Sequence, residues 1–248
     1  IEETKKKYFD VSINIKSQYR NKGLGKLFLN ECCKNFFVKN KNKKLISKIK
    51  KEGGKVFVLI FNVGSIEEFN NKKFTELRKK ETSAAMKFLK VDKYDAIFDS
   101  PNDNRYLDAK PLHDLISKIE TKSKVSLAKI KPTIVAIPSI NSHHQDHVHV
   151  FKACLAALRP LRTPRADMII SYEVPEHSRW SSSGVFQPNL YIDIEKHLTR
   201  KISAFYKYKS QVKVGGRDKH TIKNHAEYRG KEVGRKVCEA YFVHRLIG

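Results

Sequence analysis

The sequence predicts an α/β protein with a Rossmann-like, mostly parallel sheet and flanking helices. From residue 44 onward, apolar runs rich in β-branched residues alternate with amphipathic stretches. Strands that alternate with helices imply a parallel sheet with right-handed crossovers. The chain has 248 residues, of which 40% are hydrophobic, which is enough for one large α/β domain or two small ones. It has no apolar run long enough to suggest a membrane span.

The expected elements follow one another with the turn signals that such a fold needs. They are helices over residues 44–54, 74–89 and 111–120, and strands over residues 55–64, 94–99 and 133–137. The first helix ends at Gly53-Gly54, as helices commonly do. After the last of these strands, residues 150–158 predict a further helix.

The first 42 residues follow a different pattern. Residues 11–15 alternate as a strand, and glycines at 23 and 25 open a predicted helix. Arg20, Gly23 and Gly25 fill the pattern Gln/Arg-x-x-Gly-x-Gly/Ala, and this stretch, about residues 8–38, resembles the pyrophosphate-binding segment of GNAT acetyltransferases. We therefore divide the chain into residues 1–42, an acetyltransferase-like fragment or a substitute first strand and helix, and a domain over residues 43–248.

Charge and cysteine content limit the class of function. The net charge is +24, but lysine is spread along the whole chain and no nucleic-acid-binding motif accompanies it. We expect no specific nucleic-acid function and favour a phosphate-bearing small substrate such as a nucleotide sugar. The four cysteines have no CxxC spacing, which predicts reduced thiols in a cytoplasmic protein; they are Cys32, Cys33, Cys154 and Cys238.

The richest stretch for metal and proton chemistry is residues 141–150, which hold four histidines and Asp146. It lies between a predicted strand and a predicted helix, at the carboxyl end of the strand, where open α/β sheets bind ligands. His144 and His147 fall on one face if a helix begins there, and imidazole is the commonest protein ligand for zinc. Asp146 could orient one of these rings.

The alternatives at this stretch remain open. A catalytic zinc needs about three protein ligands, so at least one must come from elsewhere. His143 and His149 are candidate substitutes, and a turn-stabilising role is the alternative for Asp146. The whole stretch could also be a solvated loop that binds metal adventitiously. The other histidines are scattered and are expected to be structural or solvated: His113, His177, His197, His220, His225 and His244.

Several segments of residues 43–248 follow one another in a recognisable order. Arg78, Glu81 and Ala85 fill an Arg-x-x-Glu-x-x-x-Ala helix, and residues 144–147 match a His-Pro-Asp-His segment apart from Gln145. The remaining segments are residues 53–64, 186–194, 201–205, 209–211, 229–230 and 239–242. Together they resemble the PIG-L or LmbE-like family of zinc-dependent N-deacetylases.

The resemblance implies a zinc-dependent enzyme that removes acetyl from an N-acetylglucosamine-like amino sugar or nucleotide sugar. It implies that His144 is the electrophilic acid, Asp146 its orienting partner and His147 a metal ligand. Arg78 would bind a substrate hydroxyl or phosphate. A surface ion pair with Glu81 is the alternative for Arg78.

One departure from the family is large. The His-Pro-Asp-Asp signature, which supplies two zinc ligands and a general base at the end of the family's first strand, occurs nowhere in this sequence. Two function classes therefore remain: a metal-dependent deacetylase impaired by that loss, and a degenerate, non-catalytic member that binds a sugar or a protein partner. Loss of the first strand would leave a sheet edge open and favour homo-oligomers. We expect residues 11–15 to fill the gap, followed by a helix over residues 24–37.

Overall fold

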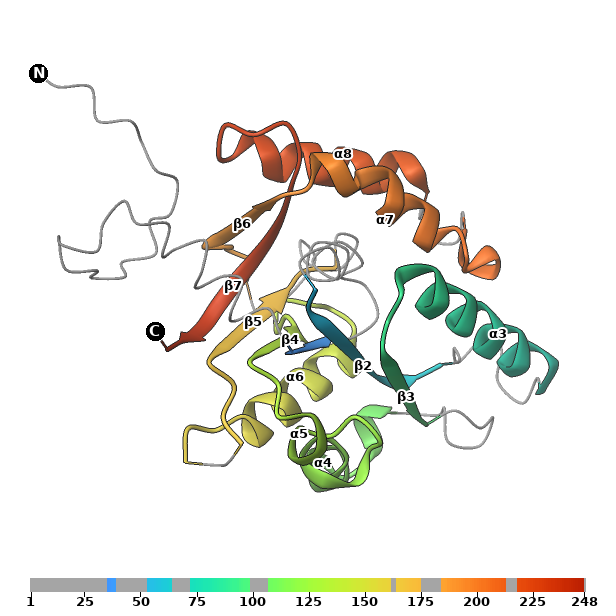
Figure 1. Ribbon diagram of the computed structural model, residues 1–248, viewed down its shortest axis with the longest axis vertical. Helices are drawn as coiled ribbons and strands as arrows, with labels where there is room; N and C mark the ends of the chain where they lie inside the picture. Colours follow the sequence, from blue (N-terminus) through green and yellow to red (C-terminus); the bar gives the residue numbers. More distant parts are fainter. Residues whose placement is uncertain are drawn as a thin grey trace, which may run out of the picture.

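The computed structural model describes residues 53–63, 72–98, 107–161, 164–174, 184–212 and 218–247, together with the backbone of residues 35–38. These residues form a seven-stranded sheet in the order β3-β2-β1-β4-β5-β7-β6, with helices on both faces (Figure 1). The predicted fold class is therefore confirmed.

The strands are β1 (Asn35–Val38), β2 (Lys55–Asn62), β3 (Lys93–Phe98), β4 (Ile134–Pro138), β5 (Met168–Tyr172), β6 (Leu190–Asp193) and β7 (Cys238–Leu246). From β3 to β5 all neighbours pair in parallel, whereas β7 runs antiparallel to both β5 and β6. In β2, Val58 and Ile60 pack into one apolar cluster, and Leu59 and Phe61 pack into another. Burial on both faces explains why this strand is a continuous apolar run.

The helices are α3 (Lys72–Leu89), α4 (Leu112–Ser117), α5 (Leu127–Ile130), α6 (Gln145–Ala157), α7 (Leu198–Phe205) and α8 (Lys219–Lys231). Short turns of helix lie at η2 (Leu107–Ala109), η3 (Lys118–Lys122), η4 (Glu195–His197) and η5 (Lys209–Gln211). Side chains from α3 and α7 join the apolar cluster on one face of the sheet, and those from α4, α5 and α6 join the cluster on the other (Figure 1). Within the described ranges, no helix is both long and apolar enough to span a bilayer.

Most of the expected elements are present. The strands expected over residues 55–64, 94–99 and 133–137 and the helix over residues 74–89 are confirmed as β2, β3, β4 and α3. The helix expected over residues 111–120 is α4 followed by the π-helical turn η3. The helix expected from residue 150 begins earlier, at Gln145. The expected helix over residues 44–54 falls almost entirely outside the described residues.

The central strand is not the one that we expected. β1 consists of residues 35–38 and pairs with both β2 and β4. The prediction of a helix over residues 24–37 is therefore wrong at its carboxyl end, because Phe36, Phe37 and Val38 are aromatic or β-branched and favour a strand. Residues 11–15 lie outside the described part.

Because β1 is paired on both sides, the unpaired edge that suggested self-association is absent at this place in the sheet. Homo-oligomer formation and the division of the chain at residue 42 both stay predictions. The strand β1 precedes residue 42, yet it pairs with β2 and β4, which both follow residue 42.

The strand order places a ligand site at one point of the sheet. β1, β2 and β3 lie successively outward in one direction, and β4 lies on the opposite side of β1. In open α/β sheets the ligand crevice lies at such a reversal, outside the carboxyl ends of the two central strands, and here the term crevice denotes this place in the sheet. Pro138 ends β4 at this crevice, and the histidine-rich stretch follows it.

Candidate active site

The two central histidines lie at the start of α6. His144 occupies the N-cap position with extended backbone, and its carbonyl accepts the N–H of His147 at 3.0 Å. The two imidazole rings stack with their centroids 5.1 Å apart and their planes 24° from parallel. His144 is exposed and His147 is half-buried. The predicted juxtaposition of these two rings is therefore present at the crevice.

A buried serine contacts both of these histidines. Ser142 Oγ lies 3.2 Å from Nδ1 of His147 and accepts the backbone N–H of His144 at 3.2 Å. Asp146 is half-buried on the first turn of α6. The contact from Ser142 helps to orient the His147 ring.

The loop between β4 and α6 is tied to the rest of the crevice rim. The N–H of Ser139 donates to the carbonyl of Tyr172, the last residue of β5, at 3.0 Å. The side-chain amide of Asn141 donates to the carbonyl of Gly184 at 3.0 Å. The histidine-bearing segment is thus tied to the end of β5 and to Gly184.

Arg78 reaches the same edge of the sheet from α3. Its Nε donates to the carbonyl of Val63, the residue just beyond β2, at 3.3 Å, and its guanidinium lies over the ring of Tyr208. Its Nη1 lies 3.5 Å from Glu81. The expected ion pair between Arg78 and Glu81 is therefore present. It is not a surface pair, because Glu81 is only 6% exposed.

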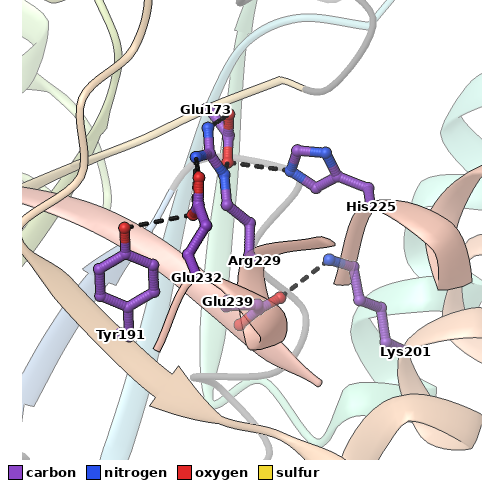
Figure 2. A network of polar contacts seen from close by, with 7 residues as sticks. All are labelled: Glu173, Tyr191, Lys201, His225, Arg229, Glu232 and Glu239. Atoms are coloured by element: carbon purple, nitrogen blue, oxygen red, sulfur yellow. Dashed lines mark hydrogen bonds and ion pairs between the residues drawn. The ribbon is translucent and has the colours of Figure 1, made fainter. Parts of the chain in front are cut away.

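A second polar cluster lies at the carboxyl end of β5 (Figure 2). Glu173 directly follows β5 and accepts Nε and Nη2 of Arg229, both at 2.7 Å, and Nε2 of His225 at 2.9 Å. Arg229 also donates to both carboxylate oxygens of Glu232. Tyr191, on β6, donates its hydroxyl to Glu232 at 3.2 Å. The cluster joins β5, β6 and α8.

The charges in this cluster hold one another ionised. Burial by itself would raise the pKa of Glu173, but the hydrogen bonds from His225 and Arg229 lower this pKa to about 2. Burial would likewise lower the pKa of Arg229, and the bonds to Glu173 and Glu232 raise it instead. Partial burial and the neighbouring Glu232 raise the pKa of Tyr191 to about 12.

Sequence reasoning did not find this cluster. It treated His225 as one of several scattered histidines and noted Arg229 only within a family segment. A local signal was present, since His225 and Arg229 are four residues apart and so fall on one face of a helix. Their partner Glu173 is 56 residues from Arg229 in the chain, and nothing in the local pattern links them.

The described residues do not provide a complete metal site. Nowhere in the described ranges do three or more His, Cys, Asp or Glu side chains come together to hold one ion. The segment that follows β1 in the sequence, residues 39–51, contains none of these residue types. The described residues around His147 therefore do not supply the three or four ligands that a zinc ion needs.

The fold and this site define a Rossmann-like α/β protein with two stacked histidines at the topological switch point of its sheet. The family model of PIG-L, described as GlcNAc-PI de-N-acetylase, matches residues 41–158. The resemblance to the PIG-L family is confirmed over this segment, which runs from just after β1 to the end of α6. No curated protein matches the chain by sequence.

Solved structures share the fold over most of the chain. The conserved protein TT1542 from Thermus thermophilus has a TM-score of 0.66 and 20% identity, covering 84% of this chain and 93% of its own. N,N'-diacetylchitobiose deacetylase from Pyrococcus horikoshii has a TM-score of 0.65 and 15% identity, covering 85% and 83%. The zinc-inhibited form of teicoplanin deacetylase Orf2 has a TM-score of 0.62 and 15% identity, covering 84% and 96%. At these identities the likeness establishes the fold.

Proposed function

We propose that this chain is a PIG-L-type hydrolase that removes the acetyl group from an N-acetylated amino sugar, free or carried on a nucleotide. One observation carries the proposal: the segment that matches the family model includes residues 144–147, and these open α6 at the carboxyl end of a central strand. Two proteins of similar fold, the diacetylchitobiose and teicoplanin enzymes, are deacetylases by name.

The roles that we propose follow the resemblance. His144, which is exposed at the mouth of the crevice, would donate a hydrogen bond to the amide oxygen as charge develops on it. Asp146 would assist His144, and His147, held by Ser142, would be a metal ligand. Arg78, anchored to the carbonyl of Val63, would contact a sugar hydroxyl or a phosphate.

A divalent metal such as zinc, which the family implies, does not fit the described residues. His147 offers one imidazole, and the sequence after β1 offers no ligand where the family signature supplies two. We therefore assign no catalytic step to a metal. Hydrolysis of the family's kind requires that the remaining ligands come from outside the described residues.

That incomplete ligand set favours a second candidate function. A degenerate member of the family would keep the sugar-binding wall of the crevice and lose hydrolysis, acting as a binding protein for an amino sugar or for a protein partner. Both candidates use the same crevice, so binding alone does not separate them.

The experiment that separates them measures three quantities on the wild type, His147→Ala and His113→Ala. These are zinc content by elemental analysis, acetate release from N-acetylglucosamine, and sugar binding by calorimetry. His113 is the matched control because its side chain is 81% exposed. About one zinc per chain with acetate release, both lost only in His147→Ala, supports the hydrolase. Sugar binding without zinc or acetate supports the second candidate in its sugar-binding form, and the absence of all three overturns both the hydrolase and that form.

A further inference from the structure

The outer face of α3 carries a regular row of positive charge. Lys73, Lys80 and Lys87 follow one another at intervals of seven residues, and all three are exposed. Neighbours in this row are about 10.5 Å apart along the helix axis. Leu77 and Ala84, which are also exposed and seven residues apart, lie between the lysines. These five residues are called the lysine stripe below.

The stripe faces away from the sheet, and its helix is fixed in place. Ala85, Met86 and Leu89, on the opposite side of α3, pack into the apolar cluster on this face of the sheet. α7 lies beside α3 (Figure 1). At the carboxyl end of α3, Nη2 of Arg200 on α7 donates to the carbonyl of Phe88 at 2.8 Å. The stripe is therefore a preformed surface on a rigid element.

The charge of the stripe is not neutralised by the carboxylates of its own helix. α3 contains two of them. Glu81 is buried and binds Ser210, and Glu76 lies on the flank of the stripe, where it pairs with Lys79 at 3.2 Å. Within the described ranges, none of the three lysines of the stripe forms an ion pair with a carboxylate.

The lysine-rich composition of the chain does not produce such a stripe on every helix. On α8, Lys223 pairs with Glu227, four residues further on, at 3.5 Å, and Glu232 lies beside Arg229. Positive and negative side chains therefore alternate on α8, as is usual for a solvated helix face. The stripe of α3 carries one sign of charge only.

The spacing of the stripe is that of a helix that packs against another helix. In a coiled coil, apolar residues at one heptad position form the contact, and charged residues at the neighbouring position pair with the partner. Leu77 and Ala84 fill such an apolar position, and the three lysines fill the flanking position. Leu77 is 43% exposed and so leaves apolar surface for a contact. The matching surface is a helix whose carboxylates repeat every seven residues beside small or apolar side chains.

Two other partners fit the stripe less well. A nucleic acid duplex carries a phosphate every ~3.4 Å along each strand, so lysines about 10.5 Å apart neutralise only a minority of them, and the backbone offers no apolar group to Leu77. A second copy of this chain also carries a net charge of +24. Two such stripes would repel each other.

We propose that the lysine stripe of α3 is a docking surface for an acidic amphipathic helix of a protein partner. The partner's Asp or Glu side chains pair with Lys73, Lys80 and Lys87, and its apolar side chains pack against Leu77 and Ala84. The proposal concerns a surface of α3 and does not depend on the chemistry proposed at the crevice.

The probe is a designed helical peptide of three heptads, with glutamate at one position of each heptad and leucine beside it. A second peptide has glutamine in place of each glutamate, and a third has lysine. Binding of each labelled peptide to the full chain is measured by fluorescence anisotropy. The measurement is made at low salt and at about 0.5 M salt, where exposed ion pairs are screened.

Two triple charge reversals are compared, and both change the net charge equally. The first combines Lys73→Glu, Lys80→Glu and Lys87→Glu. The second is the control, in which three exposed lysines outside α3 are changed to glutamate, namely Lys122, Lys152 and Lys219. Glutamate favours helix as strongly as lysine does, so α3 should stay folded. Circular dichroism and urea unfolding check that each variant is folded.

We expect the wild type to bind the glutamate peptide at least about tenfold more tightly at low salt than at high salt. Reversal of the stripe should weaken this binding about tenfold or more, and the control reversal by no more than about twofold. The stripe-reversed protein should instead bind the lysine peptide, which neither the wild type nor the control binds. This exchange of partners is the result that direct ion pairing requires.

The apolar part of the contact has its own pair of variants. Leu77→Ala should weaken binding of the glutamate peptide about threefold, because it removes apolar surface from the contact. Leu155→Ala is the control, since Leu155 is 37% exposed on α6, and it should have no effect.

Three results overturn the proposal. If the wild type does not bind the glutamate peptide, or binds it no better than the glutamine peptide, the stripe is a solvated face. If both charge reversals weaken binding equally, only the net charge matters. If a duplex RNA binds the wild type, loses binding on reversal of the stripe alone and the glutamate peptide does not bind, the partner is a nucleic acid. None of these results bears on acetate release, so the proposed function is tested separately.

Discussion

Glu81 on α3 accepts hydrogen bonds from both the backbone N–H and the hydroxyl of Ser210, at 2.8 and 2.6 Å, across 129 residues of sequence. The same carboxylate lies 3.5 Å from Arg78. It therefore links α3 to η5 and contacts the arginine that reaches the crevice. The position of α3, which carries Arg78, therefore depends on the bond between Glu81 and Ser210 in the distant turn η5.

Glu81→Ala should destabilise the protein by about 2–4 kcal/mol, because it leaves the Ser210 N–H and the Arg78 guanidinium without their buried carboxylate. Urea unfolding at neutral pH measures the loss. Glu76→Ala is the control, since Glu76 pairs with Lys79 on the exposed side of the same helix. That exposed pair should contribute less than about 1 kcal/mol. Equal losses in the two variants would contradict the role assigned to Glu81.

Arg229→Ala should cost about 3–5 kcal/mol of stability, because it removes the main partner of a buried carboxylate, Glu173. Lys236→Ala is the matched control. Its ion pair with Glu195 is solvent-exposed, so its loss should leave stability nearly unchanged. A chemical-denaturation curve for each variant gives the comparison, and a small effect of Arg229→Ala would show that the cluster adds little to stability.

Stability should fall in acid because of Glu173. Its pKa falls from 4.5 to about 2 in the folded protein, so the folded state favours the ionised carboxylate. The stabilisation is fully present above pH 4.5 and is lost as the pH falls toward 2. At ~1.4 kcal/mol per pKa unit, it is on the order of 3 kcal/mol. Urea unfolding between about pH 7 and pH 2 measures it, and the slope should be shallower in Glu173→Gln. If the free energy of unfolding depends on pH equally in the wild type and in Glu173→Gln, carboxyl groups other than Glu173 cause the loss of stability in acid.

Gly230→Ala should destabilise the protein, although alanine normally stabilises a helix relative to glycine by about 1 kcal/mol. The added Cβ would meet backbone atoms of Arg235 and Val237 at 2.7 Å, and neither can move without displacing β7. We expect a loss of about 1–3 kcal/mol, as in other overpacked sites. Lys223→Ala, at an exposed position of the same helix, is the control and should be nearly neutral. A stabilised Gly230→Ala variant would contradict the close packing of α8 on β7.

Ser142→Ala should weaken the proposed sugar-dependent activity or binding about tenfold, because Ser142 orients the His147 ring and caps the N–H of His144. Stability should fall by only about 1 kcal/mol. Ser117→Ala is the control, since its hydroxyl donates to the carbonyl of Asp114, outside the crevice. The comparison uses calorimetry with N-acetylglucosamine alongside urea unfolding. If Ser142→Ala lowers stability but leaves sugar binding unchanged, Ser142 has no role in the proposed site.

The local sequence pattern predicted the parts of the site that follow a strand. β-branched runs identified β2 and β4, and the position of His144 and His147 after such a run placed them at the crevice. The pattern did not reveal that Ser142 contacts His147. Which polar residue faces a ring depends on the backbone of the loop, and periodicity does not describe it.

Local sequence patterns were sufficient to predict the fold class, most of the strands and helices, and the family resemblance, which the family model matches over residues 41–158. The folded arrangement was needed to show that residues 35–38 form the central strand, that Glu81 binds Ser210, and that Glu173 joins Arg229 and His225. The difference arises because periodicity states which face of an element is buried, whereas a pairing between residues distant in sequence is fixed by how the elements pack.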